Sequence, residues 1–177
     1  MNLVERLLAP NAARAAGVKL YGAVVAQSRA PVFYLELGVP DTVEGRFELY
    51  TLNVSLLLVR LKGQGPKAKM VSQGLFDAYV QGLDDALRDM GVGDLSVGKK
   101  MRKLGEAFYG RVTAYEGALG TLPDEAALRE LLSRTVYAGA EGTNADRLVA
   151  YAAAARASLA GQSLEALTGG AVTWPAP

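Results

Sequence analysis

A long apolar stripe in the middle of the sequence strongly constrains the fold of the chain. The side chains of the stripe recur every three or four residues, the spacing of one face of an α-helix: Val97, Met101, Leu104, Phe108, Val112, Tyr115 and Leu119. Burying this set contributes on the order of 10–20 kcal/mol of gross stabilisation, at about 1.5–3 kcal/mol for each side chain. A misplaced charge at a helix end costs less than about 1 kcal/mol. The stripe therefore predicts a long helix, whatever charges its outer face carries.

A tight turn precedes this helix. Leu87 and Met90 end an earlier helical stripe, and Gly91 follows where a helix C-terminus favours left-handed backbone. Asp94 is then placed to cap the next helix with its carboxylate. Because two helices joined by so short a turn lie antiparallel, we predict a central helix hairpin over Lys67–Leu119.

The same turn contains a near-match to a phosphate-binding loop. Residues 93–99 read GDLSVGK, which fits the pattern G-x-x-x-x-G-K. A P-loop needs a strand before it and a Ser or Thr after the lysine to hold magnesium. Here a helical pattern comes first, and Lys100 follows the lysine. The sequence therefore favours a helix-hairpin turn over a nucleotide site.

Caps and stripes predict further helices on both sides of the hairpin. These are a helix over about Asn11–Ser28 with Val18, Tyr21, Val25 and Ser28 on one face, one from the capping box Asp41–Glu44 to about Lys62, one opened by Thr121–Asp124 with Pro123 in its first turn, and one capped by Asn144 and ending near Ala160. The helix after Asp41 is apolar almost all the way round, so we expect it to be central. No segment alternates as a strand does. We predict an all-α fold, a single-domain bundle of about six to seven helices over residues 1–177.

Composition rules out several kinds of chemistry. The 177 residues are 50% hydrophobic, enough for a sizeable core in one domain, and include no cysteine and no histidine. Disulfides, the usual zinc sites, cysteine nucleophiles, Ser-His triads and histidine-ligated haem are therefore excluded. A formal net charge of +1 argues against a general nucleic-acid coat protein. We expect no catalytic residue, no cofactor and no DNA partner.

Neither a signal peptide nor a membrane span is expected. Glu5 and Arg6 interrupt the first apolar run before a secretory segment can form. The longest strongly apolar run, Leu49–Val59, is far shorter than the about 20 residues that a spanning helix needs. The sequence therefore predicts a cytoplasmic location.

Three aspartates end the helix before the turn. Asp84, Asp85 and Asp89 resemble the clusters that hold magnesium in all-α isoprenoid synthases, and Asp85 and Asp89 share a helix face. Such enzymes need a second acidic cluster on a facing helix, which this chain lacks, and Arg88 can pair locally with Asp84 or Asp85. A magnesium-dependent enzyme acting on an isoprenoid diphosphate is the alternative to a solvated acidic face.

The helix after the turn begins with a dense basic cluster: Lys99, Lys100, Arg102 and Lys103. Residues 96–111 hold five basic side chains, Arg111 included, and one glutamate, a net charge of +4. Cations near a helix N-terminus oppose the macrodipole, so local stability does not select them. The apolar stripe turns them outward, and we expect them near Arg111. They form either a solvated face or a docking surface for an acidic partner, ribosomal RNA or anionic lipid headgroups.

Further along this helix stands the quartet Phe108-Tyr109-Gly110-Arg111. Its aromatic side chains are interpreted mainly as core. Gly110 weakens a helix by about 1 kcal/mol relative to alanine. We therefore expect a close neighbour there, from the chain itself or from a partner.

Taken in order, a series of short motifs resembles the ubiquinol–cytochrome c chaperone family. The motifs are Leu20-Tyr21, Gln27–Tyr34, Gly38–Thr42, Gly45–Phe47, Leu75–Asp77, Leu87–Asp89, Gly91–Leu95, Val97–Lys99 and Phe108–Arg111. They make a family-like core of about residues 21–119, and the resemblance is weaker in the C-terminal helices, 121–177. Two positions depart from the pattern, which commonly has an acid at Gly82 and a glutamate at Asp89.

The resemblance implies a non-enzymatic assembly factor for the cytochrome bc1 complex. Its client would be newly made cytochrome b or another bc1 subunit, with a small helper protein, close to the ribosome and peripheral to the anionic inner membrane. The missing mitochondrial presequence would fit a bacterial member. The candidate partner-binding residues are Lys99, Lys100, Arg102, Lys103, Arg111, Tyr109, Asp84 and Asp85.

Overall fold

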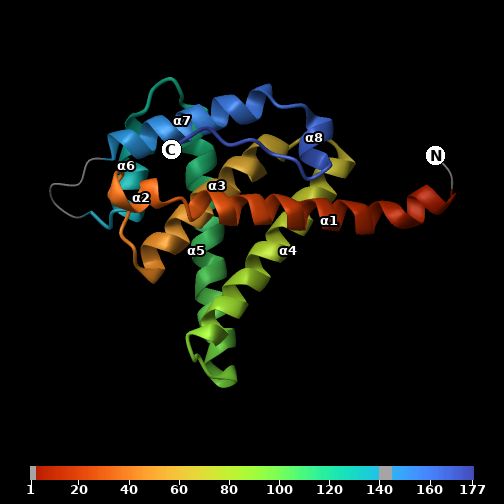
Figure 1. The fold of residues 1–177 in the computed structure, drawn as a ribbon, viewed down its shortest axis with the longest axis horizontal. Helices are drawn as coiled ribbons and strands as arrows, with labels where there is room; N and C mark the ends of the chain where they lie inside the picture. Colours follow the sequence, from red (N-terminus) through yellow and green to blue (C-terminus); the bar gives the residue numbers. More distant parts are fainter. Residues whose placement is uncertain (1–2, 140–144) are drawn as a thin grey trace.

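The computed structural model describes residues 3–139 and 145–177, and all their regular structure is helical (Figure 1). The helices in chain order are α1 (Leu3–Ser28), α2 (Pro31–Leu35), α3 (Val43–Leu61), α4 (Pro66–Asp89), α5 (Asp94–Gly120), α6 (Ala126–Thr135), α7 (Asp146–Gly161) and α8 (Leu164–Thr168). Six of these eight have seven residues or more. The predicted all-α fold is thereby confirmed. Across the described ranges, no helix is both long and apolar enough to cross a bilayer.

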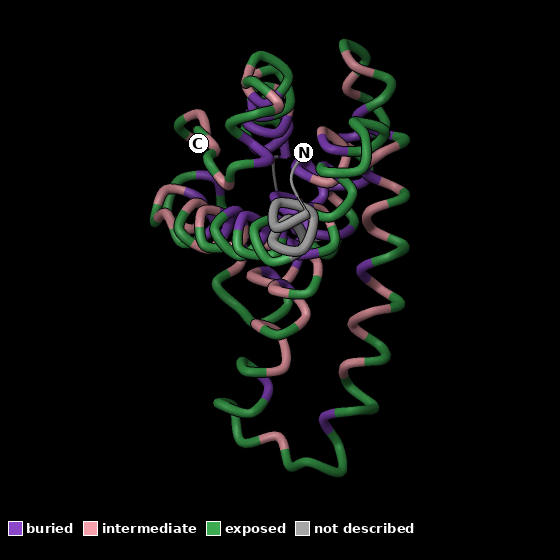
Figure 2. The backbone as a smooth tube through the Cα atoms, turned by 90° about the vertical axis from the view of Figure 1, so that its right-hand side faces the viewer, coloured by how far each residue is buried: buried purple, intermediate pink, exposed green. Residues whose placement is uncertain are grey.

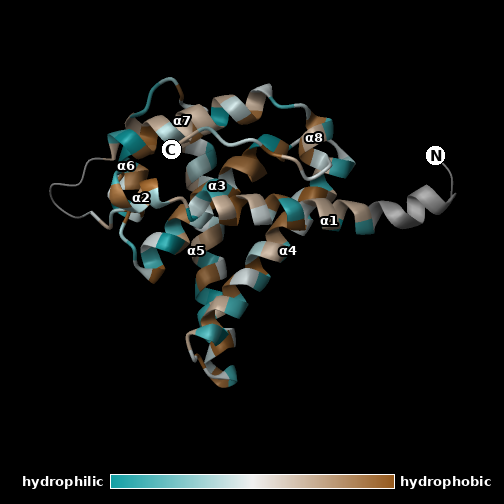
Figure 3. Cartoon of the chain, viewed as in Figure 1, coloured by the Kyte–Doolittle hydropathy of each residue, from teal (hydrophilic) through white to brown (hydrophobic). Residues whose placement is uncertain are grey.

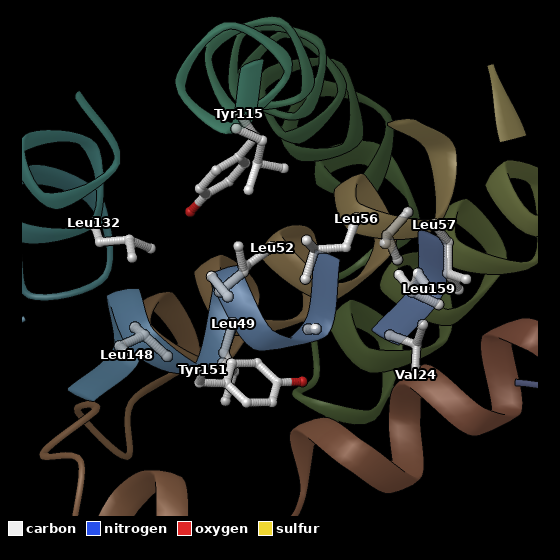
Figure 4. Packing of buried hydrophobic residues seen from close by; sticks show 14 of the residues in the cluster. Val24, Leu49, Leu52, Leu56, Leu57, Tyr115, Leu132, Leu148, Tyr151 and Leu159 are labelled. Carbon is white, nitrogen blue, oxygen red and sulfur yellow. The ribbon is translucent and has the colours of Figure 1, made fainter. Parts of the chain in front are cut away.

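Helix α3 is the centre of the molecule, as predicted. Thr42 caps it by accepting a hydrogen bond from the Gly45 backbone N–H at 3.1 Å. Every residue from 51 to 57 is buried, because α1, α4, α5 and α7 all pack around this helix. Figure 4 shows the leucines of α3 between Tyr115 of α5 on one side and Tyr151 of α7 on the other.

Helices α1 and α4 cross at a pair of glycines. A Cβ atom on Gly17 would overlap the backbone of Gly74 and Leu75, and a Cβ on Gly74 would lie 2.9 Å from the Arg14 Cα. Only residues without side chains allow the two backbones to approach so closely. This contact orients α1 and decides which of its residues face inward.

The predicted end of α1 at Ser28 is confirmed, but its predicted start was wrong and its predicted inward face only partly right. The helix already runs from Leu3, so Asn11 lies inside it and does not cap it. Val18 is 52% exposed, and the buried side chains of the described part are Ala13, Ala16, Leu20, Val24 and Ser28. Small residues face α4, whereas the prediction had followed hydrophobicity alone.

A buried polar network joins α1, α3 and α7. The Asn53 side-chain amide donates to Ser28 Oγ at 2.9 Å, and the Tyr151 hydroxyl donates to Asn53 Oδ1 at 2.8 Å. Gln27 donates to the Tyr151 hydroxyl at 3.2 Å and to the carbonyl of Pro175 at 3.1 Å. The network satisfies polar groups inside the core and ties down the C-terminal tail.

The C-terminal helices follow the predicted stripes, but their starts differ. Leu128, Leu131 and Leu132 of α6 and Leu148, Tyr151, Ala155 and Leu159 of α7 are buried as predicted. Pro123 lies in the turn before α6, where the Asp124 carboxylate accepts from the Ala126 N–H at 3.0 Å. Asn144, the predicted cap of α7, lies outside the described residues.

The predicted hairpin is formed by α4 and α5. Gly91 adopts a φ of +77°, the left-handed conformation expected after α4. The Phe108 ring of α5 packs against the rings of Phe76 and Tyr79 of α4, with centroids 5.5 and 4.8 Å apart. Beyond these contacts the hairpin extends away from the other helices, and its far end is largely exposed (Figures 1 and 2).

The structure of the hairpin turn shows what residues 93–99 form and which residue caps α5. Residues 93–99 form the turn and the first turns of α5, with helix α4 in front where a P-loop needs a strand. The helix-hairpin interpretation is therefore confirmed. Gly93, and not Asp94, is the N-cap of α5, since Asp94 is the first residue of the helix and its carboxylate accepts from Arg88.

Candidate functional site

The four residues Lys99, Lys100, Arg102 and Lys103, which we name the basic face, are all exposed on α5. The apolar stripe of this helix faces α3, α4 and α6, so these side chains turn outward as predicted. None of the four forms a hydrogen bond or ion pair with any residue that the structure describes. The basic face is therefore free to contact an external anionic surface.

Arg111, unlike the residues of the basic face, forms an ion pair within the protein. Its guanidinium donates to both carboxylate oxygens of Glu48 on α3, at 2.8 Å from Nη2 to Oε1 and 2.8 Å from Nε to Oε2. The hydrogen bonds with Glu48 raise the pKa of Arg111 above its ordinary value. The Arg111 side chain is 31% exposed and that of Glu48 only 10%. Arg111 thus links α5 to α3 through an ion pair.

The acidic residues lie on the other arm. Asp84 is half-buried and accepts from Arg88 Nε at 2.6 Å, while the exposed Asp85 accepts from Gln81 at 2.8 Å. Across residues 3–139 and 145–177, no three carboxylates are gathered where they could hold a metal ion. Asp89 borders a groove whose lining contains no second carboxylate, whereas the isoprenoid diphosphate hypothesis requires a deep cavity with facing carboxylates. That hypothesis is not supported.

The quartet at 108–111 divides between core and surface. Phe108 is buried, whereas Tyr109 is 62% exposed, with its ring centroid 5.7 Å from that of Phe76. A Cβ atom on Gly110 would have no heavy atom within 4 Å, so the expected close neighbour is absent among the residues that the structure describes. Because each residue turns a helix by 100°, only part of such a run can face the core. Tyr109 is accessible to a partner.

The sequence did not reveal a groove between the hairpin and helices α1 and α3, which extends along α4 from Tyr79 to Met90. It has a volume of about 360 Å³ and is walled by α1, α3, α4 and α5. Its apolar lining includes Tyr21, Phe47, Leu83, Met90 and Leu104. We name this feature the groove. Its residues come from four helices, so no single stripe could predict it, although Tyr21, Phe47 and Leu87 of its wall belong to motifs singled out above.

Polar groups border the groove. Arg29 donates to the Tyr50 hydroxyl at 3.1 Å, and Arg46 donates to Asp41 at 2.6 Å and lies over the Tyr34 ring at 5.0 Å. Burial raises the pKa of the Tyr21 phenol, which keeps it neutral. An apolar floor with hydrogen-bonding groups at the rim suits a segment that exposes apolar side chains along a polar backbone.

This architecture occurs in known proteins. The chain is 35% identical to a crystal structure described as the Cbp3 homolog from Brucella abortus, with a TM-score of 0.87 over 99% of this chain and 97% of that one. It is also similar to the ubiquinol–cytochrome c reductase complex assembly factor 1 of two vertebrates. The identity is 27% over 122 residues for Mus musculus and 24% over 121 residues for Xenopus laevis.

These vertebrate relatives are longer proteins. The matched parts span 69% and 68% of this chain, but only 41% of the mouse protein and 60% of the frog protein. The family described as ubiquinol-cytochrome C chaperone matches residues 35–174, which include the C-terminal helices as well as the hairpin. The chain therefore belongs to the ubiquinol–cytochrome c chaperone family.

Proposed function

We propose that this protein is a non-enzymatic assembly chaperone for the ubiquinol–cytochrome c reductase (bc1) complex and that its client is cytochrome b. The observation that carries the proposal is the family match over residues 35–174, which contains the whole of α3, α4 and α5. These three helices supply most of the groove. The part of the chain by which the family is recognised thus also builds most of the groove.

The groove suits a client of this kind. A subunit that will enter a membrane exposes apolar side chains until it is inserted, and covering them gains free energy from burial. The groove offers aromatic and aliphatic side chains, including Phe47 and Leu83, with Arg29 and Arg46 at its border. The cationic border can bind an acidic side chain or a helix C-terminus of the client.

The outer sides of the hairpin are proposed for other partners. Asp85 and Asp84 on α4 form an acidic arm that fits a basic surface, such as that of a small helper protein. Tyr109 adds an exposed ring that can bury apolar area in an interface. The two arms therefore carry opposite charges for different contacts.

Deleting the gene tests the function. We expect loss of assembled, haem-loaded bc1 complex, measured by native gel and haem spectra of membranes. Normal amounts of the complex in the deletion strain would contradict the proposal. Complementation with the wild-type gene controls for effects on neighbouring genes.

A substitution in the groove tests the surface. Ala86 of α4 is exposed and borders the groove, so Ala86→Trp fills the space without removing a core contact. We expect this variant to fold and to fail in complementation. The matched control is Gln81→Trp, on the same helix but outside the groove, where only a surface hydrogen bond to Asp85 is lost. If both variants restore bc1 complex fully, the groove is not the client site.

A further inference from the structure

The tip of the hairpin (residues 90–95) exposes aliphatic side chains. Leu95, at the start of α5, is fully exposed, and Met90 is 50% exposed. Both lie beside the turn between α4 and α5, the end of the hairpin that projects away from the other helices and carries hydrophobic and hydrophilic residues side by side (Figures 2 and 3). Large aliphatic groups held in water at a projecting end indicate a surface that is covered when the protein works.

Three cations of the basic face share a helix side with Leu95. Lys99, Arg102 and Lys103 follow it at i+4, i+7 and i+8, the positions that stack on one face of an α-helix. Lys100 lies beside them, and all four are exposed. An exposed aliphatic end is therefore continued by a strip of positive charge along the same side of α5.

The nearby carboxylates do not neutralise the positive charge of this strip. Asp84 and Asp94 both pair with Arg88, and Asp85 belongs to the α4 arm. Asp89 is exposed at the end of α4 and borders the groove. On the outer side of α5 the next carboxylate is Glu106, three residues beyond Lys103 and further from the tip. The acidic side chains therefore lie mainly on α4, and the excess of positive charge lies on α5.

We propose that this hairpin tip is a docking surface for an anionic lipid bilayer, with Leu95 and Met90 entering the interface and the basic face contacting headgroup phosphates. This goes beyond the client proposal, because it assigns a different ligand to the tip, which shares only Met90 with the lining of the groove. A projecting end can meet a flat bilayer while the rest of the molecule stays clear of it (Figure 1). Aliphatic insertion beside a cluster of lysines is the combination that binds peripheral proteins to anionic membranes.

Leu95 and Met90 favour a bilayer over RNA. Phosphate contacts with RNA use basic residues, but its bases are bound by stacking on aromatic rings, not by aliphatic side chains. The nearest exposed aromatic on α5 is Tyr109, fourteen residues from Leu95 and about 21 Å further along the helix. The bilayer also explains the position of the groove, which reaches Met90 and would open close to the membrane surface.

Vesicle flotation with the purified full chain tests the proposal. We expect binding to vesicles of phosphatidylcholine with phosphatidylglycerol, weaker binding at high salt, and little binding to phosphatidylcholine alone. Reversing Lys99, Lys100, Arg102 and Lys103 to glutamate should lower the affinity at least about a hundredfold, and Leu95→Ser about tenfold. The charge-matched control reverses four exposed basic residues outside the hairpin tip, Lys67, Lys69, Arg134 and Arg156, and should bind nearly as wild type.

A depth measurement separates insertion from charge attraction. The chain has no cysteine, so Leu95→Cys can carry a single environment-sensitive fluorophore. Its emission should shift to the blue on anionic vesicles, whereas the same label at Thr113, exposed on α5 eighteen residues away, should not shift. No vesicle binding, equal binding by wild type and both tip variants, or an equal shift at both labels would overturn the proposal. So would RNA binding that needs the basic face but not Leu95, without vesicle binding.

Discussion

The guanidinium of Arg111 on α5 donates three hydrogen bonds to the nearly buried carboxylate of Glu48 on α3, with N–O distances of 2.8 to 3.1 Å. This pair joins the projecting hairpin to the central helix. Both helices also contribute side chains to the groove, so the pair links two of its walls.

Removing one partner should therefore be costly. Arg111→Ala leaves the Glu48 carboxylate without its cation at 10% side-chain exposure. A fully buried pair costs about 3–5 kcal/mol to break, and because Arg111 is partly exposed we expect about 2–3 kcal/mol. Urea unfolding monitored by circular dichroism measures the loss. Arg102→Ala on the exposed side of the same helix serves as the control, and a similar loss there would show that the ion pair is not the cause.

The glycine crossing of α1 and α4 gives a second prediction. Gly17→Ala places a methyl group into the backbone of Gly74 and Leu75, so we expect a loss of at least about 2 kcal/mol. Gly22→Ala, on the same helix with no atom within 4 Å of the new Cβ, should instead stabilise by about 0.5–1 kcal/mol. Thermal unfolding of the two variants measures the difference, and equal effects would contradict the close crossing.

The buried polar network around Asn53 and Tyr151 gives a third prediction. Tyr151→Phe removes the hydroxyl that donates to Asn53 and accepts from Gln27, so the buried Oδ1 atom of Asn53 loses its donor. We expect a loss of about 1–3 kcal/mol in the free energy of unfolding. Tyr109→Phe changes only an exposed hydroxyl and should stay within about 0.5 kcal/mol of wild type. A neutral Tyr151→Phe would mean that the network does not stabilise the core.

Gly110 gives a fourth prediction, in the opposite direction. Since this position is exposed and a Cβ would meet no heavy atom, Gly110→Ala should stabilise α5 by about 0.5–1 kcal/mol. Urea unfolding of the isolated protein checks the sign. Destabilisation would indicate a close contact that the structure does not show.

The sequence predicted what a single helix determines by itself. The stripe from Val97 to Leu119 fixes how α5 is rotated against α4, and so the exposure of the basic face followed directly. Gly91 marked the turn for a similar local reason, because left-handed backbone favours glycine.

Features that depend on contacts between distant segments could not be predicted. Glu48 lies 63 residues before Arg111, so nothing local indicated that this arginine differs from Lys103. The inward face of α1 is chosen by the backbone of Gly74, not by its most apolar residues. Asp94 has the right spacing for a cap, but Arg88 competes for its carboxylate. The groove needs four helices placed together before it exists.

The central claim is that cytochrome b is bound in the groove, and crosslinking from that site tests it most directly. A photoreactive amino acid at Ala86, on the border of the groove, is activated in cells that are synthesising the bc1 complex, and the adducts are identified by mass spectrometry. We predict a crosslink to cytochrome b from Ala86 and none from Gln81 on the same helix. No adduct with cytochrome b from Ala86, in a variant that still restores bc1 assembly, would contradict the account.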